Sequence, residues 1–322
     1  MIDELDKKIL KRIQKQVVSG EILAKDLGVT RTAIWKRIKK LKQAGYQIKS
    51  TPKGYLLLDN KNLLLENEVK PLLNTSLIGR EYLYFDQIDS TNRYAKTHPL
   101  KEGTVVIAQR QTAGKGRKDR RWLSTGKGIY FSLVLEPKLP IDELLRFSAL
   151  FPYVVRKTVE IFTKKEVGIK WPNDIFLNGK KVSGILIESE IEAERINRLI
   201  VGIGLNVNDT VEDLEQIKDT ATSMLIETGK NFSKKEILSF LLDEIEKEYI
   251  KFLSNIDFRK SILKELNRYL LWKGKKIKVF NENQTLEGIL IGINENGAVL
   301  IKKGKSINVL YSGDISLRKE DV

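Results

Sequence analysis

The sequence contains no cysteine and only one histidine, His98, among its 322 residues. The absence of cysteine excludes disulfides, thiolate nucleophiles and cysteine-bound metal ions. A Ser-His-Asp triad or a histidine-rich metal site would have to use His98, which precedes Pro99 at a predicted helix end and is interpreted as a surface residue. The chemistry must therefore depend mainly on lysine, arginine, carboxylates, amides and backbone groups, and no protein ligand for a resident metal is predicted.

Long apolar runs are also missing. No run approaches the roughly 20 residues that a membrane span needs, so no membrane partner is expected. The charged N-terminus lacks the apolar stretch and small-residue cleavage site of a signal peptide. We therefore expect a cytoplasmic globular protein, large enough for two or three domains.

What the sequence has in excess is positive charge. Lysine and arginine number 57 against 42 aspartates and glutamates, which gives a net charge of +15 at pH 7. Such an excess favours acidic or polyanionic partners, nucleic acid among them. A generally lysine-rich proteome would produce the same excess.

Residues 1–60 have the pattern of a winged helix-turn-helix domain. Ser19 and Thr30 are expected to cap the second and third helices, and Gly28 ends the second. Three helices followed by two strands are predicted, at residues 3–17, 21–27, 31–44, 46–50 and 55–58.

The third predicted helix is basic and contains no aspartate or glutamate. Residues 1–60 hold 14 lysines and arginines against 6 carboxylates. A helix that enters the DNA major groove presents donors to base edges and phosphates. A solvated basic helix in an interaction domain remains the alternative. The predicted DNA contacts are Arg31, Thr32, Lys36, Arg37 and Lys40.

The remaining chain alternates strands and helices and predicts an α+β protein with three domains, residues 1–60, 61–270 and 271–322. Residues 180–190 and 198–206 are expected to form an antiparallel pair in a mixed or antiparallel sheet. The central helices are predicted at residues 92–97, 141–162, 224–228 and 234–256. The last fifty residues predict five short strands, which fit a small SH3-like barrel.

A glycine-containing basic loop follows the strand that is predicted to end near Gln109. In Gly114-Lys115-Gly116-Arg117-Lys118-Asp119-Arg120-Arg121-Trp122, two glycines accompany five basic side chains. Glycine lets backbone N–H groups approach a ligand closely, and the cations can bind phosphate oxygens. The spacing fits neither GxxxxGK[ST] nor GxGxxG. By charge alone, a flexible basic surface loop fits equally well.

Three further polar segments are candidates for a site. Each has a structural alternative: a helix cap, an Asx turn and a strand with lysines at its edge, respectively. All of them together are harder to explain as structural features. The segments are Asp89-Ser90-Thr91-Asn92, Lys170-Trp171-Pro172-Asn173-Asp174-Ile175 and Lys180-Lys181-Val182-Ser183-Gly184-Ile185-Leu186-Ile187-Glu188.

With Gln111 to Arg117 and Gly202-Ile203-Gly204-Leu205-Asn206-Val207-Asn208, these segments resemble, in order, the motifs of the biotin protein ligases. The winged helix and the C-terminal strands extend the resemblance over the whole chain, to the bifunctional bacterial form. That form is both biotin–[acetyl-CoA-carboxylase] ligase and biotin operon repressor. The resemblance implies a class II synthetase-like catalytic domain.

The resemblance also assigns residues to ligands. It implies that biotin is bound by Ser90, Thr91, Asn92, Gln111, Gly114, Lys115, Gly116, Arg117, Lys181 and Gly184. It implies that ATP and the adenylate are bound by Lys115, Arg117, Trp122, Asn173, Lys181, Asn206, Asn208 and Arg318. Lys115 and Asp119 depart from the family loop, which has arginine and glycine at these positions.

The implied reaction joins biotin and ATP into biotinyl-5′-adenylate, with Mg²⁺ on the phosphates. Biotin then passes to a lysine of the biotin carboxyl carrier protein of acetyl-CoA carboxylase. Lys181, Arg117 and Asp174 are the implied catalytic residues. The adenylate-bound form is expected to be a homodimer that binds operator DNA. A lipoate–protein ligase, a dedicated ligand-sensing repressor and a ligase without DNA binding are the alternatives.

Overall fold

The computed structural model describes residues 3–14, 16–58, 63–281, 284–311 and 313–317. Contacts between residues divide the chain into two units, Met1–Leu72 with Ser233–Lys235, and Leu73–Phe232 with Glu236–Val322. Three domains with boundaries near residues 60 and 270 remain a prediction. Among the described residues, no helix has the length and apolarity that crossing a membrane requires.

The first unit begins with three helices and a two-stranded hairpin, as predicted, but the first helix ends at Ile13 and not at residue 17. Ser19 and Thr30 accept hydrogen bonds from the third backbone N–H that follows each of them, and Gly28 ends the second helix in the left-handed conformation, with φ 66°. The elements are α1 (Glu4–Ile13), α2 (Gly20–Leu27), α3 (Arg31–Gln43), β1 (Ile48–Thr51), β2 (Gly54–Leu57), α4 (Glu66–Val69) and the 3₁₀ turn η1 (Lys70–Leu72).

An ion cluster fixes α1 against α3. The guanidinium of Arg37 donates to both carboxylate oxygens of Asp3 at 2.7 Å and to Asp6 at 2.8 Å. Lys40 donates to Asp6 at 2.6 Å, and Asp6 is fully buried. Because an unpaired buried carboxylate is costly, these two cations are needed where they are. They therefore serve the fold of this domain.

Replacing Arg37 with glutamine should raise the pKa of Asp3. In the native chain the hydrogen bond from Arg37 lowers that pKa from 3.8 to about 2. A lowered carboxyl pKa contributes stability that is present above the unfolded pKa and is lost as the pH falls through about 2. Carboxyl carbon NMR of the full chain should show the Asp3 midpoint moving upward in Arg37→Gln. Lys36→Gln, on the exposed side of α3, is the matched control, and an unchanged midpoint in Arg37→Gln would contradict the pairing.

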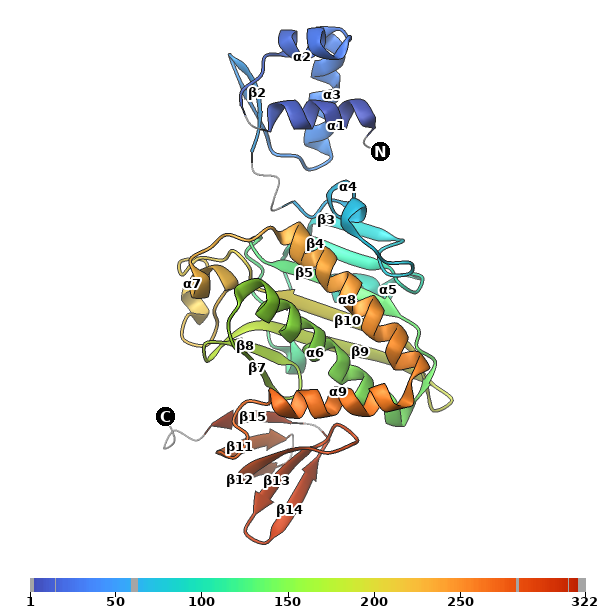
Figure 1. The fold of residues 1–322 in the computed structure, drawn as a ribbon, viewed down its shortest axis with the longest axis vertical. Helices are drawn as coiled ribbons and strands as arrows, with labels where there is room; N and C mark the ends of the chain where they lie inside the picture. The colour runs from blue at the N-terminus through green and yellow to red at the C-terminus, as the bar shows by residue number, and fades with distance from the viewer. Residues whose placement is uncertain (1–2, 15, 59–62, 282–283, 312, 318–322) are drawn as a thin grey trace. The chain divides into compact units, whose positions relative to one another are not determined.

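The second unit is built on a mixed eight-stranded sheet of order β3-β4-β5-β10-β9-β8-β7, with β6 beside β10 (Figure 1). Strands β3 and β4 are parallel, and the other pairs are antiparallel. The predicted pairing of residues 180–190 with 198–206 is confirmed. The strands are β3 (Tyr82–Ile88), β4 (Val105–Gln111), β5 (Ile129–Leu135), β6 (Leu139–Pro140), β7 (Val167–Lys170), β8 (Asp174–Leu177), β9 (Lys180–Glu192) and β10 (Arg195–Leu205).

Helices cover this sheet on its two faces. Every residue of β5 is buried, which requires cover on both sides. Helix α5 (Thr91–Thr97) packs on β4, β5 and β10 through Ala95, while α6 (Leu144–Thr163) packs on β7, β8 and β9. In Figure 1, α6 and α8 (Lys234–Ser254) run across the front of the sheet. The short elements are the 3₁₀ turns η2 (Arg117–Asp119), η3 (Ile141–Glu143) and η4 (Glu215–Ile217), and helix α7 (Met224–Thr228).

Helix α9 (Ile256–Arg268) was not predicted, because the preceding helix was expected to run to Ile256. Asn255 accepts a hydrogen bond from Phe258 N–H at 3.0 Å and starts the new helix. The chain then enters a five-stranded antiparallel sheet, which confirms the five predicted strands. Its order is β14-β13-β12-β11-β15, formed by β11 (Lys276–Asn281), β12 (Gln284–Ile293), β13 (Val299–Lys303), β14 (Ser306–Leu310) and β15 (Asp314–Leu317).

Candidate functional site

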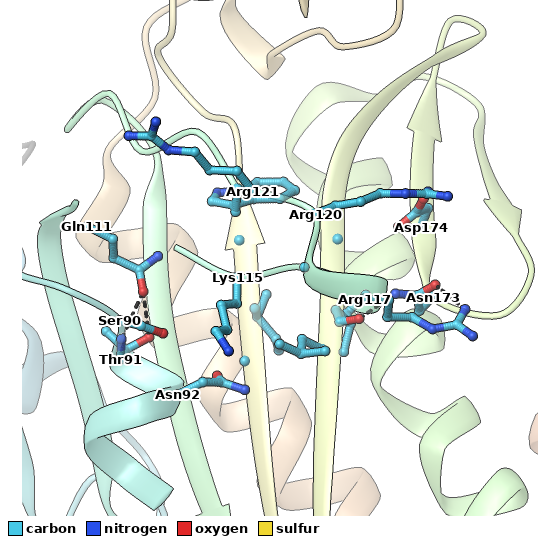
Figure 2. A pocket seen from close by; sticks show the side chains of 18 of the residues that line it. Ser90, Thr91, Asn92, Gln111, Lys115, Arg117, Arg120, Arg121, Asn173 and Asp174 are labelled. Atoms are coloured by element: carbon cyan, nitrogen blue, oxygen red, sulfur yellow. Dashed lines mark hydrogen bonds between the residues drawn. The ribbon is translucent and has the colours of Figure 1, made fainter. Parts of the chain in front are cut away.

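One pocket gathers most of the predicted ligand-binding residues (Figure 2). It is formed by the start of α5, the basic loop (residues 114–122), the start of β8 and the facing stretches of β9 and β10. The predicted residues that line it are Ser90, Thr91, Asn92, Gln111, Lys115, Gly116, Arg117, Trp122, Asn173, Asp174, Lys181 and Gly184. Residues from widely separated parts of the sequence therefore form one site.

The N-terminus of α5 supplies a buried set of hydrogen-bonding groups. Gln111 accepts hydrogen bonds from the backbone and hydroxyl of Thr91 at 2.8 and 3.1 Å. Ser132, on β5, donates to Asn92 at 2.5 Å. Ser90 caps the helix, and its side chain is almost fully buried. These short polar side chains are held rigidly and can recognise a small polar head group.

Asn92 also connects this end of the pocket to an acidic group. Its amide donates to Glu188 at 3.1 Å, and Lys96 donates to the same carboxylate at 3.1 Å. Burial opposes the charge of Glu188, but the hydrogen bonds from Asn92 and Lys96 outweigh it and lower its pKa. The positive charge of Lys115, which extends into the pocket in Figure 2, acts in the same direction.

Lys181 provides the cation at the opposite end. Its Nζ lies 2.7 Å from Asp174 Oδ1 and 5.4 Å from the centroid of the Trp122 ring. Its backbone is fixed by hydrogen bonds of 2.9 Å with Thr220 and Thr222. A lysine held by a carboxylate and an aromatic face, in a partly desolvated pocket, can stabilise negative charge on a ligand.

Arg117 joins the basic loop to the neighbouring strands. Its guanidinium donates to Asn173 Oδ1 at 3.2 Å. Asn173 in turn donates to the carbonyl of Ile185 at 2.6 Å and accepts from its N–H at 3.0 Å. Figure 2 shows Arg117 and Asn173 side by side. Arg117 and Lys181 therefore both bring positive charge to the side of the pocket where β8 begins.

Glycines in β9 and β10 leave space for these side chains. Gly184 and Gly204 face each other across the two strands. A Cβ on Gly204 would lie 2.7 Å from the indole nitrogen of Trp122, and one on Gly184 would lie 3.0 Å from Lys181 Nζ. A Cβ on Gly202 would overlap the amide of Asn92. The floor of the pocket therefore accepts only glycine if these side chains stay in place.

Two predicted nucleotide ligands do not line the pocket. Asn206 is buried and donates to the carbonyl of Thr222 at 2.9 Å. Asn208 is also buried, and its side-chain amide forms hydrogen bonds with both backbone groups of Phe232, at 2.8 and 2.9 Å. Both amides therefore hold the backbone of the segments that follow β10.

The loop contains further differences from the prediction. Gly114 is not among the lining residues, and its carbonyl accepts from Trp122 N–H at 2.8 Å. Arg318 lies outside the described residues. Arg120 and Arg121 do line the pocket, although only their charge signalled them in the sequence. The buried Trp122 indole N–H has no hydrogen-bond partner among the described residues.

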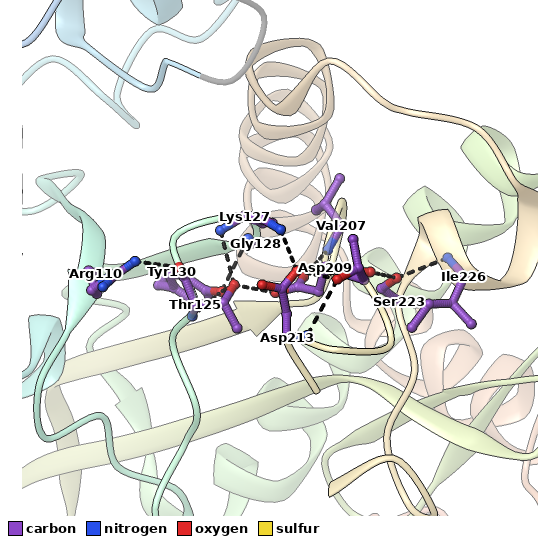
Figure 3. Close-up of polar contacts among 11 residues, drawn as sticks. Arg110, Thr125, Lys127, Gly128, Tyr130, Val207, Asp209, Asp213, Ser223 and Ile226 are labelled. Atoms are coloured by element: carbon purple, nitrogen blue, oxygen red, sulfur yellow. Dashed lines mark hydrogen bonds and ion pairs between the residues drawn. The ribbon is translucent and has the colours of Figure 1, made fainter. Parts of the chain in front are cut away.

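A buried aspartate anchors the segment that follows the basic loop (Figure 3). Asp209, fully buried, accepts a short hydrogen bond from the Thr125 hydroxyl and one of 3.0 Å from Val207 N–H. The Tyr130 hydroxyl accepts from Thr125 N–H at 3.1 Å, and Ser223 donates to the Asp209 carbonyl at 2.6 Å. Burial raises the pKa of Asp209, against the effect of these hydrogen bonds. These contacts therefore fix the position of the segment that connects the basic loop to β5.

The predicted DNA-contacting residues lie on two sides of α3. Arg31, Thr32 and Lys36 are exposed. Arg37 and Lys40 instead bind the carboxylates of α1. Because these two cations already have partners inside the domain, we do not propose them as DNA contacts. The sequence could not separate them, since all five positions fit a basic helix.

Three family models match successive parts of the chain. An HTH domain matches residues 6–56, the biotin/lipoate A/B protein ligase family matches 84–206, and the biotin protein ligase C terminal domain matches 274–318. The bifunctional ligase/repressor BirA of Bacillus spizizenii is 35% identical over 308 residues, which are 94% of each chain. Its counterpart in Escherichia coli is 28% identical over the same length.

A solved structure agrees with this assignment. The biotin protein ligase from Aquifex aeolicus, in complex with biotin and ATP, is 35% identical with a TM-score of 0.65. The match covers 74% of this chain and 99% of that one. Fold and pocket thus define a protein ligase of the biotin/lipoate class. More narrowly, the chain belongs to the family of bifunctional ligase/repressors that join such a ligase to a DNA-binding domain.

Proposed function

We propose that the chain forms biotinyl-5′-adenylate from biotin and ATP and transfers biotin to a lysine of a biotin carboxyl carrier protein. One observation carries this proposal. A single pocket joins the rigid polar end around Ser90 and Asn92 to a cationic end formed by Lys181 and Arg117. The polar end suits the head group of biotin, and the cationic end suits its carboxylate together with the phosphates of ATP.

In the first step a carboxylate oxygen of biotin forms a bond to the α-phosphorus of ATP, and pyrophosphate leaves. Both reactants are negatively charged, so the step needs positioning and charge neutralisation more than a protein nucleophile. Lys181 and Arg117 supply the positive charge. Trp122, whose ring lies beside Lys181, would contact the adenine.

In the second step a lysine amine of the carrier attacks the acyl carbon of the mixed anhydride, and AMP leaves. Asp174 is the candidate to orient or deprotonate that amine. Its carboxylate is bound by Lys181 at 2.7 Å and is largely buried. Asp174 would therefore position Lys181 in the first step and orient or deprotonate the amine in the second.

Mg²⁺ belongs to this proposal as a companion of the phosphates. Among the described residues, no cluster of three or more histidines, cysteines or carboxylates could hold a metal ion. Asp174 is the only carboxylate among the described lining residues. That donor set fits a magnesium ion held mainly by phosphate oxygens and water. Bound there, it would neutralise phosphate charge.

The experiment that tests the ligase is ATP–pyrophosphate exchange with biotin, lipoate or neither acid. Exchange should depend on biotin, because the adenylate forms only when the acid occupies the polar end of the pocket. Lipoate-dependent exchange would identify a lipoate–protein ligase. If neither biotin nor lipoate supports exchange and no biotin is transferred to a carrier protein, only a ligand-sensing repressor remains.

The second proposed activity is repression, with the adenylate as corepressor. The basic exposed face of α3 and the HTH match support DNA binding. A homodimer of the adenylate-bound chain would present two such domains to an inverted repeat. An inverted-repeat duplex should therefore be enriched from a randomised pool when biotin and ATP are present, and much less without them.

A further inference from the structure

Trp35 is a large aromatic side chain that the winged-helix domain leaves in solvent. It lies on α3 and is 53% exposed, whereas tryptophan is highly buried on average. The inward face of the helix is already complete, because Ile34, Ile38 and Leu41 are 0, 3 and 0% exposed. The core of the domain therefore makes no use of this indole, and its exposure needs another explanation.

Positive charge surrounds the indole along the same side of the helix. Arg31 and Lys39 lie one turn before and one turn after Trp35, and Lys42 lies one turn further. The Lys39 Nζ is 5.6 Å from the centroid of the indole ring. All three cations are exposed. A polyanion that approaches this face meets an apolar group set among cations.

The cavity beside Trp35 lies between α3 and the β1–β2 hairpin. Arg31, Trp35 and Lys39 line it from α3, and Thr51 and Tyr55 line it from the strands. Lys42 and Ser50 also line it, and Lys42 donates to Ser50 at 3.0 Å. Arg37 and Lys40 bind α1 instead, so the surface offered to a ligand is the side centred on Trp35. This side of α3 therefore differs from the side that the distribution of charge in the sequence indicated as the DNA-binding surface.

Duplex DNA is the polyanion whose chemistry matches this surface. Its phosphates suit the cations, and an α-helix fits the major groove. The base edges in that groove carry mainly donors and acceptors, and the thymine 5-methyl group is the apolar exception. An indole flanked by cations can bury that methyl while the cations bind phosphates or guanine.

We propose that Trp35 reads thymine in the operator by contact with its 5-methyl group, flanked by Arg31 and Lys39. This inference rests on the proposed repressor function and adds the residue that determines specificity. It assigns to the operator half-site a thymine that faces the middle of α3. Arg37 and Lys40, which hold α1, make no such contact.

The experiment begins with a duplex selected from a randomised pool by the full chain with biotin and ATP. Each thymine of the half-site is then replaced by 2′-deoxyuridine, which lacks only the methyl group. One replacement should weaken binding about fourfold, the factor expected for about 0.8 kcal/mol per buried methyl-sized group. Trp35→Ala should weaken binding to the thymine duplex by roughly tenfold and abolish the thymine–uracil difference at that position.

Ile22→Ala is the matched control, because Ile22 is an equally exposed apolar side chain on α2, also at 53%. It should leave the thymine–uracil difference intact. A second measurement does not depend on how the variants fold. A duplex with 5-bromo-2′-deoxyuridine at the sensitive position, irradiated with the native chain, should crosslink to the peptide that contains Trp35.

The outcomes separate this inference from the repressor function itself. If no duplex is enriched, the repressor proposal fails. If a duplex is enriched but no thymine is sensitive to loss of its methyl, the reading by Trp35 is wrong. It is equally wrong if Trp35→Ala retains the full thymine–uracil difference, or if the crosslink maps elsewhere. Tighter binding to the separated single strands would indicate base stacking on the indole and would also overturn it.

Discussion

Lys181→Ala is expected to reduce biotin-dependent ATP–pyrophosphate exchange by at least two to three orders of magnitude, the scale typical for removal of one preorganised group that stabilises transition-state charge. The substitution removes the cation that lies 2.7 Å from Asp174 and beside the Trp122 ring. It also leaves the Asp174 carboxylate unpaired in the pocket, where it repels the phosphates of ATP. Both effects act against the same step.

The neighbouring residue offers a matched control. Lys180 donates to the carbonyl of Lys218 at 2.8 Å and does not line the pocket. Lys180→Ala changes the net charge by the same amount and should keep exchange near the native rate. The double variant Lys181→Ala/Asp174→Asn separates the two effects. Recovery of most of the exchange would mean that the unpaired carboxylate caused the loss, and near-normal exchange in Lys181→Ala alone would remove its assigned role.

The regular elements were largely predictable because local signals agreed with the tertiary structure. Ser19 and Thr30 cap helices where their positions before apolar-periodic segments placed them. The β9–β10 pair was predictable from two apolar strands around a charged turn. Helix α9 was missed because Asn255 interrupts a helical pattern without a glycine or proline to mark the break. Its cap is visible only from the hydrogen bond that Asn255 accepts.

The site was predictable as a set of segments, but the role of individual side chains was not. Polar residues of the right type look alike in sequence whether they meet a ligand or a backbone carbonyl. Asn173 lines the pocket, whereas Asn206, also predicted as a ligand, holds the carbonyl of Thr222. On α3, Lys36 and Arg37 are adjacent cations with opposite fates, because only Arg37 faces the carboxylates of α1. Such differences follow from tertiary contacts, which the spacing of residues does not encode.

Gly204→Ala should raise the KM for ATP by roughly 10- to 100-fold with a smaller change in the KM for biotin. The new Cβ would lie 2.7 Å from the indole nitrogen of Trp122. The backbone of Gly204 cannot retreat, because β10 is paired with β5 on one side and β9 on the other. The indole must move instead, and overpacking of this kind costs about 1–3 kcal/mol. Initial rates of exchange at varied ATP and varied biotin give the two constants.

A double-mutant cycle with Trp122 tests the cause of that loss. Trp122→Ala should itself raise the KM for ATP, since the proposed adenine contact is removed. If Gly204→Ala acts by displacing the indole, it should add little further loss in the Trp122→Ala background. If Gly204→Ala raises the KM for ATP equally in both backgrounds, the effect arises elsewhere, for instance in the pairing of Gly204 with Gly184 of β9. Because Lys181 Nζ also lies over the Trp122 ring, a displaced indole would additionally disturb the cation. The cycle should therefore show a kcat effect that Gly204→Ala and Trp122→Ala share.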